Sequence, residues 1–260
     1  MNLVDKYGPW ALISGASSGL GEEFARQLAA QGLNLVLLAR RTERLESLGK
    51  ELKSQHGIDY RAVSADLADP DFLAPVADQT EDLEIGLLIN NAGFTNSGNF
   101  LDNDLQSEIR LVDVNCRAAM ILAHHYGQGM RQRKRGGMIF TASIAGFVGI
   151  PFWGNYSASK SFDLKLAEAL GAELKPHGVD VLALCPGATR TEFATYDGLI
   201  SQVMTMPAEP VVAGAIKRLG KRRTWVAGLI NRINVFATRF LPRTWSSILF
   251  GVVVRDIVKH

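Results

Sequence analysis

A tyrosine and a lysine four residues apart, preceded by a serine, form the most reactive set of side chains in this sequence. Tyr156 and Lys160 lie one turn apart on the same face if their segment is helical. Ser143 ends residues 138–143, an apolar run typical of a buried strand. An ammonium beside a phenol favours the phenolate, so the three groups could perform acid–base chemistry at one point. Most Tyr-x-x-x-Lys pairs are solvated on a helix surface, so the rest of the chain must place this one in a site.

A glycine-rich segment follows the first predicted strand. Apolar residues 10–13 lead into residues 14–21, Ser-Gly-Ala-Ser-Ser-Gly-Leu-Gly, and an amphipathic helical pattern comes next. Strand, glycine turn and helix together point backbone N–H groups and a helix N-terminus at a pyrophosphate. The spacing is Gly-x-x-x-Gly-x-Gly, which differs from the usual Gly-x-Gly-x-x-Gly, so an ordinary tight turn remains the alternative.

Two arginines follow the second predicted strand, residues 34–39. A site for NAD needs an acidic residue here to hold the ribose 2′-hydroxyl, but positions 38–41 contain no Asp or Glu. The guanidinium groups of Arg40 and Arg41 instead suit the 2′-phosphate of NADP. The alternative is that they merely open a charged helix over residues 42–55. The missing acid and the paired arginines together favour NADP(H) as the cofactor.

Strands and helices alternate along most of the chain. The predicted strands are residues 10–13, 34–39, 60–65, 85–89, 138–143 and 179–184, with 224–227 as a last edge strand. Right-handed crossovers then predict an α/β fold, a single doubly wound (Rossmann) parallel sheet with helices on both faces. Every motif falls at the carboxyl end of a strand, where such sheets bind ligands. We expect residues 1–227 to form a dinucleotide-binding catalytic domain.

Composition sets limits on other functions. A chain of 260 residues with 47% hydrophobic side chains can bury one large core, and a net charge of +2 gives no reason to expect a nucleic-acid partner. Cys116 and Cys185 lack metal-ligand spacing and the five histidines form no cluster, so we expect no metal site. There is no visible signal peptide and no apolar run near the ~20 residues that span a bilayer, which favours a cytoplasmic protein.

The last segment, residues 228–260, is both apolar and basic. No acid appears between Glu209 and Asp256, and arginines interrupt the hydrophobic residues. Such a helical extension could lie peripherally on the anionic inner surface of a membrane. We favour the alternative, in which its apolar face covers the substrate cleft of the same domain or a partner subunit.

Taken together, the motifs resemble the short-chain dehydrogenase/reductase family, in its compact NADP-preferring form, over roughly residues 10–193. The family's phosphate loop matches residues 14–21, with Ser14 at the usual threonine, and its Asn-Asn-Ala-Gly matches residues 90–93. The resemblance implies a catalytic set of Asn115, Ser143, Tyr156 and Lys160. The implied cofactor contacts are Gly15, Ser17, Ser18, Gly19, Leu20, Gly21, Arg40, Arg41, Asp66, Leu67, Asn91, Ala92, Gly93, Tyr156, Lys160, Pro186, Gly187, Ala188, Thr189 and Thr191.

The implied reaction interconverts a ketone and a secondary alcohol by hydride transfer. Tyr156 would give its proton to the carbonyl oxygen, and Lys160 would lower the phenol's pKa from ~10 by roughly two or three units. Ser143 would donate a hydrogen bond to the substrate oxygen. By resemblance alone, Lys160 would also hold the nicotinamide ribose, Asn115 would position a proton-carrying water, and Asp66 and Leu67 would contact the adenine.

The loop at residues 145–155 predicts the kind of substrate. It contains the large apolar residues Phe147, Val148, Ile150, Pro151, Phe152 and Trp153. These residues favour a hydrophobic ketone such as a ketoacyl chain, a steroid-like ketone or a retinoid-like compound, and the tail resembles that of bacterial ketoacyl and steroid reductases. Relatives commonly pair, so we expect a homo-oligomer, a dimer or tetramer. The main alternative is a catalytically silent NADPH-binding sensor or membrane-associated scaffold.

Overall fold

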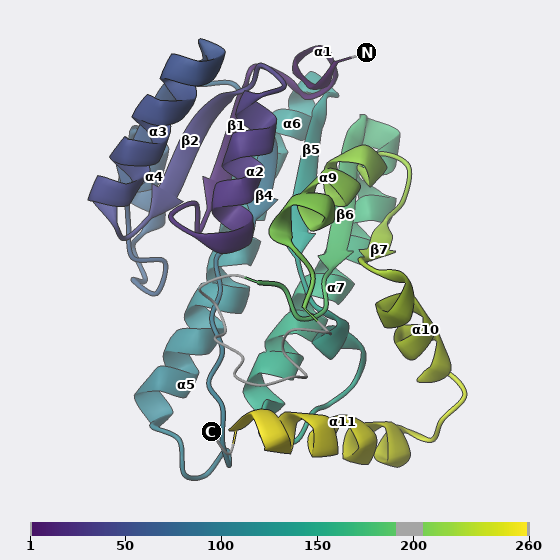
Figure 1. Cartoon of the computed structure of the whole chain (residues 1–260). Helices are drawn as coiled ribbons and strands as arrows, with labels where there is room; N and C mark the ends of the chain where they lie inside the picture. Colours follow the sequence, from purple (N-terminus) through teal and green to yellow (C-terminus); the bar gives the residue numbers. More distant parts are fainter. Residues whose placement is uncertain (1, 191–204, 259–260) are drawn as a thin grey trace.

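A computed structural model, which describes residues 2–190 and 205–258, has a seven-stranded parallel sheet at its centre (Figure 1). The strands are β1 (Trp10–Ser14), β2 (Asn34–Ala39), β3 (Tyr60–Ser64), β4 (Ile85–Asn90), β5 (Gly136–Thr141), β6 (Val179–Cys185) and β7 (Thr224–Val226). Their order is β3-β2-β1-β4-β5-β6-β7, and every neighbouring pair is parallel. The predicted doubly wound sheet is confirmed, and its crossovers change direction between β1 and β4.

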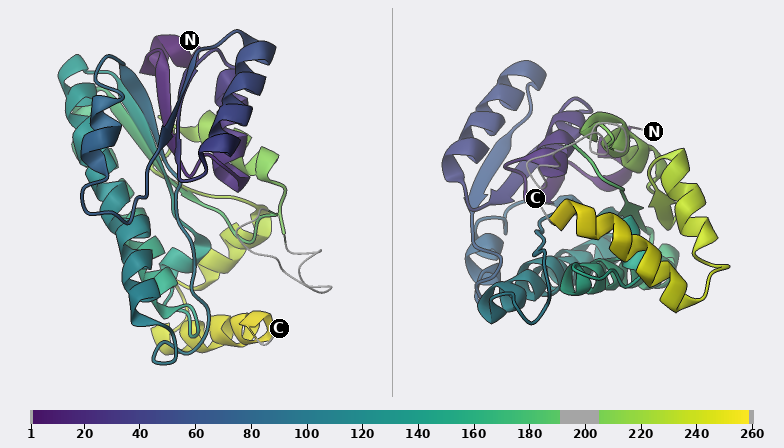
Figure 2. Two further views of the ribbon diagram at one scale, coloured as in Figure 1. Left: turned by 90° about the vertical axis from the view of Figure 1, so that its left-hand side faces the viewer. Right: turned by 60° about the horizontal axis from the view of Figure 1, so that its bottom comes forward.

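Helices cover both faces of the sheet (Figures 1 and 2). These helices include α1 (Leu3–Tyr7), α2 (Gly19–Ala29), α3 (Thr42–His56), α4 (Leu73–Asp78), α6 (Ala119–Arg133), η3 (Lys175–His177) and α9 (Ala208–Arg218). Side chains from α2, α3 and α9 share one core with one face of the sheet, whereas α4, α6 and α7 (Gly154–Glu173) share another core with the opposite face. Strands β4 and β6 are buried along their whole length, because a parallel sheet is covered on both sides.

The sequence pattern of residues 103–132 is that of one long helix, but the structure divides this segment between β4 and β5 into three parts. It begins as α5 (Leu105–Val112), widens into the π-helix η1 (Asp113–Ala118) and continues as α6. Asn115 lies in the π-helical turn and is fully buried. The periodicity of the sequence indicates a helix here but does not reveal this change of winding, because a single π-helical turn is too short to alter the pattern clearly.

Two helix starts differ from the sequence prediction. Asp69, Pro70 and Asp71 have the residue types that cap a helix and fill its first turn, but α4 begins only at Leu73, and the Asp69 carboxylate accepts the backbone N–H of Asp71 at 2.9 Å in a separate turn. The short helix α1 was not predicted at all. It is started by Asn2, whose side-chain oxygen accepts the N–H of Asp5 at 2.7 Å.

The C-terminal segment forms two further helices, α10 (Leu229–Ala237) and α11 (Arg243–Val258). Helix α11 lies below the start of α7, at the end of the molecule opposite the N-terminus (Figure 1). It packs closely on the loop before α7, since a Cβ added to Gly251 would lie 2.8 Å from Cγ of Pro151. Within the described ranges, no helix is long and apolar enough to cross a bilayer.

Candidate active site

Ser143, Tyr156 and Lys160 meet beyond the carboxyl end of β5. The strand ends at Thr141, two residues earlier than expected, and Ser143 instead caps the short helix η2 (Ile144–Phe147), where its hydroxyl accepts the N–H of Ala145 at 3.1 Å. Tyr156 lies in the first turn of α7, is 8% exposed and is hydrogen-bonded to Ser143. The indole of Trp153 packs edge-on against the Tyr156 ring, 5.7 Å between centroids. The structure therefore brings together the hydroxyl and phenol expected from the sequence.

Lys160 is buried one turn further along α7. Its Nζ donates to the carbonyl oxygen of Thr141 at 2.8 Å and to Oδ2 of Asp163 at 2.9 Å. An ammonium has three N–H groups, so these two bonds leave one donor for another partner. Asp163 was not singled out in the sequence. Its signal was its position, an acid three residues after Lys160 on a helix face expected to be buried.

Asn115 joins three parts of the site through both ends of its amide. Its Oδ1 accepts the N–H of Phe94 at 3.0 Å, and its Nδ2 donates to the carbonyl of Phe94 at 3.0 Å and to Oγ of Ser159 at 3.0 Å. Gly93 lies against the same groups, since a Cβ there would be 3.1 Å from Asn115 Oδ1 and 3.4 Å from Lys160 Nζ. Asn115 is therefore close to Lys160, as expected for a member of the same site.

The glycine-rich segment has the form expected for a phosphate cradle. Gly15 and Gly19 have φ values of 70° and 59°, and a Cβ on Gly21 would overlap the carbonyl oxygen of Gly15. Ser18 begins α2 without a side-chain bond to the first turn, which leaves the backbone N–H groups there to bind an anion. These features fit the pyrophosphate of a dinucleotide.

The segment after β4 is tied to this cradle by a serine. Oγ of Ser14 accepts the N–H groups of Asn91 at 3.0 Å and Ala92 at 3.1 Å, and itself donates to the carbonyl of Ile89. A serine therefore provides the hydroxyl for which the family usually has threonine. Asn91, Ala92 and Gly93 consequently lie beside the turn that holds Gly15.

The two arginines after β2 are exposed, and Arg41 lies over the glycine-rich segment. Nε and Nη2 of Arg41 donate to Oγ of Ser17 at 3.2 and 3.0 Å. A cation at this position fits a 2′-phosphate. The carboxylate of Asp66 forms an ion pair with Arg110 of α5 at 2.7 Å, a partner that the sequence did not indicate.

The segment after β6 closes the site from the other side. The carbonyl oxygen of Pro186 accepts the N–H of Ile144 at 3.0 Å, so this turn is joined to the residue after Ser143. Gly187 packs on α10, where a Cβ would lie 2.5 Å from Nδ2 of Asn231. Ala188 and Thr189 follow in the described part of the chain, whereas Thr191 lies outside the described residues.

The electrostatics of Tyr156 differ from the expectation. Burial raises the pKa of its phenol, and although the Lys160 ammonium and the Ser143 hydrogen bond oppose this rise, the net direction is upward. The predicted net lowering is therefore wrong for the protein alone. The sequence argument counted the attraction of Lys160 but omitted both desolvation and the negative charge of Asp163.

Apolar side chains form a wall beside Tyr156. This cluster consists of Leu111, Ala145, Ile150, Tyr156 and Val254, with Phe94, Phe152, Trp153 and Phe250 packed against it. Two of its members come from α11, so the C-terminal helix contributes to the surroundings of the phenol. Phe152 adopts a left-handed backbone with φ 68°, a strained conformation for a large residue.

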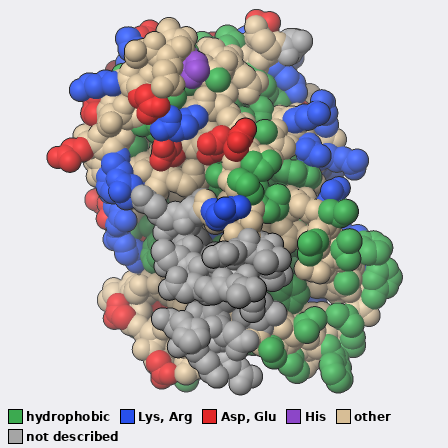
Figure 3. All heavy atoms as spheres, in the orientation of Figure 1, with side chains coloured by type: hydrophobic (Ala, Val, Ile, Leu, Met, Phe, Trp, Pro, Cys, Tyr) green, Lys and Arg blue, Asp and Glu red, His purple; other side chains and the backbone are tan. Residues whose placement is uncertain are grey.

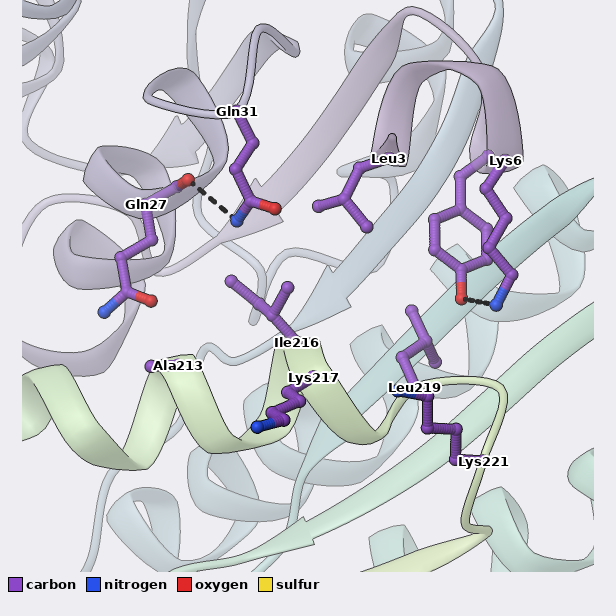
Figure 4. Close-up of a pocket in the computed structure, with 10 residues that line it drawn as sticks. Leu3, Lys6, Gln27, Gln31, Ala213, Ile216, Lys217, Leu219 and Lys221 are labelled. Carbon is purple, nitrogen blue, oxygen red and sulfur yellow. Dashed lines mark hydrogen bonds between the residues drawn. The ribbon is translucent and has the colours of Figure 1, made fainter. Parts of the chain in front are cut away.

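A separate cleft of about 400 Å³ lies between α1, α2 and α9 (Figure 4). Leu3, Lys6, Gln27 and Ile216 are among its lining residues. Because α1 precedes β1 and Gln27 lies at the far end of α2 from the glycine turn, this cleft is at the amino ends of the strands. It is therefore distinct from the candidate active site.

Comparison with known proteins agrees with this geometry. Residues 9–198 match the family described as short chain dehydrogenase. A 7beta-hydroxysteroid dehydrogenase of Mediterraneibacter gnavus is 33% identical over 241 residues, which are 90% of this chain and 92% of the relative.

Solved structures show the same relationship. The structure from a study of 7beta-hydroxysteroid dehydrogenase stereoselectivity has a TM-score of 0.91 and 30% identity, with 96% of this chain and 100% of the other covered. A short-chain dehydrogenase of Sphingobium yanoikuyae in complex with NADPH has a TM-score of 0.78 and 34% identity, with 89% and 93% covered. The protein therefore belongs to the short-chain dehydrogenase/reductase family and is an oxidoreductase acting on alcohol and carbonyl groups.

Proposed function

We propose that this protein is an NADP(H)-dependent oxidoreductase that interconverts a hydrophobic ketone and the corresponding secondary alcohol. The observation that carries the proposal is the meeting of Ser143, Tyr156 and Lys160 in a buried site beyond the carboxyl end of β5. A protein that only binds a nucleotide has no need for a buried phenol beside an ammonium.

In the direction of reduction, Tyr156 donates its phenolic proton to the carbonyl oxygen as negative charge develops there. Ser143 donates a second hydrogen bond to the same oxygen. NADPH, when bound, supplies the hydride. A phenol whose pKa is raised remains protonated at neutral pH, which suits a general acid. In oxidation the same phenol must first lose its proton, so this direction is favoured at higher pH.

Lys160 and Asn115 act on the site without touching the reacting carbon. The remaining N–H of Lys160 is available to hold the ribose of the nicotinamide nucleotide, and its ammonium opposes the rise in the pKa of Tyr156. Asn115 fixes Phe94 against α7, and we retain the proposal that it positions a water in a proton path.

Preference for NADP(H) is supported by the arginines after β2. Arg41 lies on Ser17 in the glycine-rich segment, and positions 38–41 have no acid that would hold a ribose 2′-hydroxyl. The NADPH complex of the Sphingobium yanoikuyae relative is in keeping with this choice. We propose that Gly15, Ser17–Gly21, Asp66, Leu67 and residues 91–93 and 186–191 complete the cofactor site.

A hydrophobic substrate is supported by the apolar wall beside Tyr156. Ile150, Phe152 and Trp153 come from the loop before α7, and Phe250 and Val254 from α11. We propose that residues 228–260 act as a cover over the substrate cleft of the catalytic domain, residues 1–227. The relative named as a 7beta-hydroxysteroid dehydrogenase supports a bulky ketone of the steroid type, with ketoacyl and retinoid-like ketones as further candidates.

The test is consumption of NADPH with a panel of ketones, comparing the wild type with Tyr156→Phe. We expect turnover of lipophilic ketones by the wild type and a loss of at least 100-fold in the variant, with the affinity for NADPH retained. Binding of NADPH by both proteins without turnover of any substrate would instead favour the sensor or scaffold. Faster turnover of small charged keto-acids than of lipophilic ketones would contradict the proposed substrate class.

Self-association and location are further proposals. Exposed apolar residues on neighbouring helices suit contact with a second copy, and they are Leu105, Ile109 and Val112 of α5, Met120 of α6 and Phe162 of α7. We propose a homo-oligomer, which light scattering can test.

We also propose that the protein is cytoplasmic. Contact of the tail with the inner membrane surface is the second candidate, favoured by the exposed apolar residues on α10 and α11 (Figure 3).

A further inference from the structure

Asp163 is a buried carboxylate inside the proposed catalytic machinery. It is 3% exposed and lies on α7, three residues after Lys160 and seven after Tyr156. This spacing places the three side chains on one face of the helix, with Lys160 in the middle. Burial of a carboxylate is costly unless a cation pairs with it, so the position requires an explanation.

Lys160 is the hydrogen-bonding partner that the structure gives to this carboxylate. Oδ2 of Asp163 accepts from Lys160 Nζ at 2.9 Å, whereas Oδ1 is buried and has no hydrogen-bond partner among the described residues. Burial raises the pKa of Asp163, and the Lys160 ammonium opposes that rise and so favours the carboxylate. The charge of Asp163 pairs with Lys160 and also raises the pKa of the Tyr156 phenol. An ammonium that is paired with a carboxylate stabilises a nearby phenolate less than an isolated ammonium does.

The other titratable groups around this pair are neutral thiols. Cys116 comes from η1 and Cys185 from β6, and burial raises the pKa of both, that of Cys116 to about 12. Asn115, Thr141 and Ser143 complete the surroundings with uncharged groups. Asp163 is thus the negative charge that opposes Lys160 in this part of the described structure.

We propose that Asp163 is a positioning residue that holds Lys160 by an ion pair and offsets its charge, so that Tyr156 stays protonated to higher pH and reduction is sustained there. This inference rests on the proposed function, in which Tyr156 is the proton donor. The expected signature is a dependence on pH, because removing the carboxylate leaves the full ammonium charge beside the phenol.

The first experiment needs no turnover. Phenolate absorbance follows the ionisation of Tyr156 in the protein without nucleotide. The absorbance of Tyr156→Phe is subtracted, because this variant contains only the other four of the five tyrosines. In Asp163→Asn, which keeps the size of the side chain and an oxygen for Lys160, we expect the Tyr156 step at least one pH unit lower than in the wild type. An unchanged or higher step in Asp163→Asn and in a second variant, Asp163→Ser, would overturn the proposal.

The wild type alone also tests the idea. Carbon-13 NMR of labelled tyrosine, assigned with Tyr156→Phe, should show Tyr156 titrating above the ordinary value of ~10. A step below the ordinary value of ~10 in the wild type would contradict a carboxylate that keeps the phenol protonated. This measurement holds even if both Asp163 variants are too unstable to purify.

The second experiment measures kcat/KM for NADPH-dependent reduction against pH. The pH at which kcat/KM declines on the alkaline side should be at least one unit lower in Asp163→Asn than in the wild type. Above the wild-type midpoint of this decline, kcat/KM of the variant should therefore be about tenfold lower. The matched control is Asp180→Asn, another buried carboxylate, which pairs with Lys6 and Lys175 near the start of β6. Asp180→Asn should lower the stability of the protein and leave the pH of the alkaline decline in kcat/KM unchanged. An equal shift of this decline in both variants would overturn a specific role for Asp163.

The two experiments separate this inference from the proposed function. A lowered Tyr156 step without turnover of any ketone would support the role of Asp163 in setting the phenol's ionisation and would count against the enzyme activity. Turnover by the wild type with an unmoved Tyr156 step in Asp163→Asn would support the activity and overturn the role of Asp163.

Discussion

Gly251 of α11 lies against the proline ring of Pro151, in the loop that leads to Tyr156. A Cβ at Gly251 would be 2.8, 3.1 and 3.1 Å from three ring atoms of Pro151. Helix α11 approaches this loop closely only because residue 251 has no side chain. The contact joins the C-terminal extension to the apolar wall of the site.

The first prediction concerns this contact. Gly251→Leu should push α11 away from the loop, at a cost of about 1–3 kcal/mol for overpacking. We expect turnover of bulky ketones to fall by more than fivefold while the dissociation constant for NADPH stays within twofold. Urea denaturation and steady-state kinetics measure the two effects. The control is Gly154→Leu at the start of α7, where a Cβ meets nothing within 4 Å. Equal effects of the two substitutions would argue against a cover formed by α11.

The second prediction concerns the choice of nucleotide. If Arg41 binds the 2′-phosphate as proposed, Arg41→Ala should remove charge-assisted hydrogen bonds, each worth about 1.5–3 kcal/mol. KM for NADPH should therefore rise about tenfold or more, whereas KM for NADH should change little. Arg131→Ala serves as the control, since this exposed arginine lies near the end of α6. A parallel rise in KM for both nucleotides would show that Arg41 does not read the 2′-phosphate.

The third prediction concerns the amide of Asn115. Asn115→Ala leaves the N–H and carbonyl of Phe94 and the hydroxyl of Ser159 without this partner in a buried place. We expect a loss of about 2–4 kcal/mol in the free energy of unfolding, because each orphaned group costs about 1–3 kcal/mol. Urea denaturation measures the loss. Asn99→Ala, which removes an exposed bond to Asp102, should change stability by no more than about 0.5 kcal/mol.

The fourth prediction concerns acid stability. Burial would raise the pKa of Asp180, but Lys175 at 2.7 Å and Lys6 at 2.8 Å hold that pKa below its usual value. A depressed folded-state pKa gives stability that is present above the unfolded value of ~3.9 and lost as pH falls through the folded value.

Asp180→Asn should therefore reduce the free energy of unfolding by about 1–3 kcal/mol at pH 7, and the difference should shrink below about pH 4. Thermal unfolding between pH 3 and 7 checks this dependence. The matched control is Asp59→Asn, since the pair of Asp59 with Lys53 is mostly exposed and contributes about 0–1 kcal/mol. A difference that stays constant down to pH 3 would contradict the assignment to ionised Asp180.

The sheet was predictable because its strands are short apolar runs followed by polar or glycine-rich turns. β2 and β7 begin where the pattern placed them, and β6 ends one residue later. The ligand-binding end of the sheet followed from the same pattern, since Ser143 and the glycine turn each come after a strand. Local periodicity was sufficient here because buried parallel strands require it.

Other parts of the site depend on contacts between distant residues. Asn115, in the π-helical turn, is hydrogen-bonded to Phe94 and Ser159, which are 21 and 44 residues away. The pairing of Asp66 with Arg110 likewise crosses from one βα unit to the next. The ionisation of Tyr156 required knowledge of its burial and of Asp163, and the spacing of Tyr156 and Lys160 alone gave the wrong direction.

The double hydrogen bond between Asn115 and Phe94 has a mechanical consequence. A shift of the segment at Gly93 and Phe94 would pull on α7 or break these bonds, because the same amide also donates to Ser159 on that helix. A nucleotide that presses on Gly93 would thus transmit its arrival directly to the turn bearing Tyr156. In the proposed enzyme, cofactor loading would thereby bear on the alignment of the phenol through one side chain.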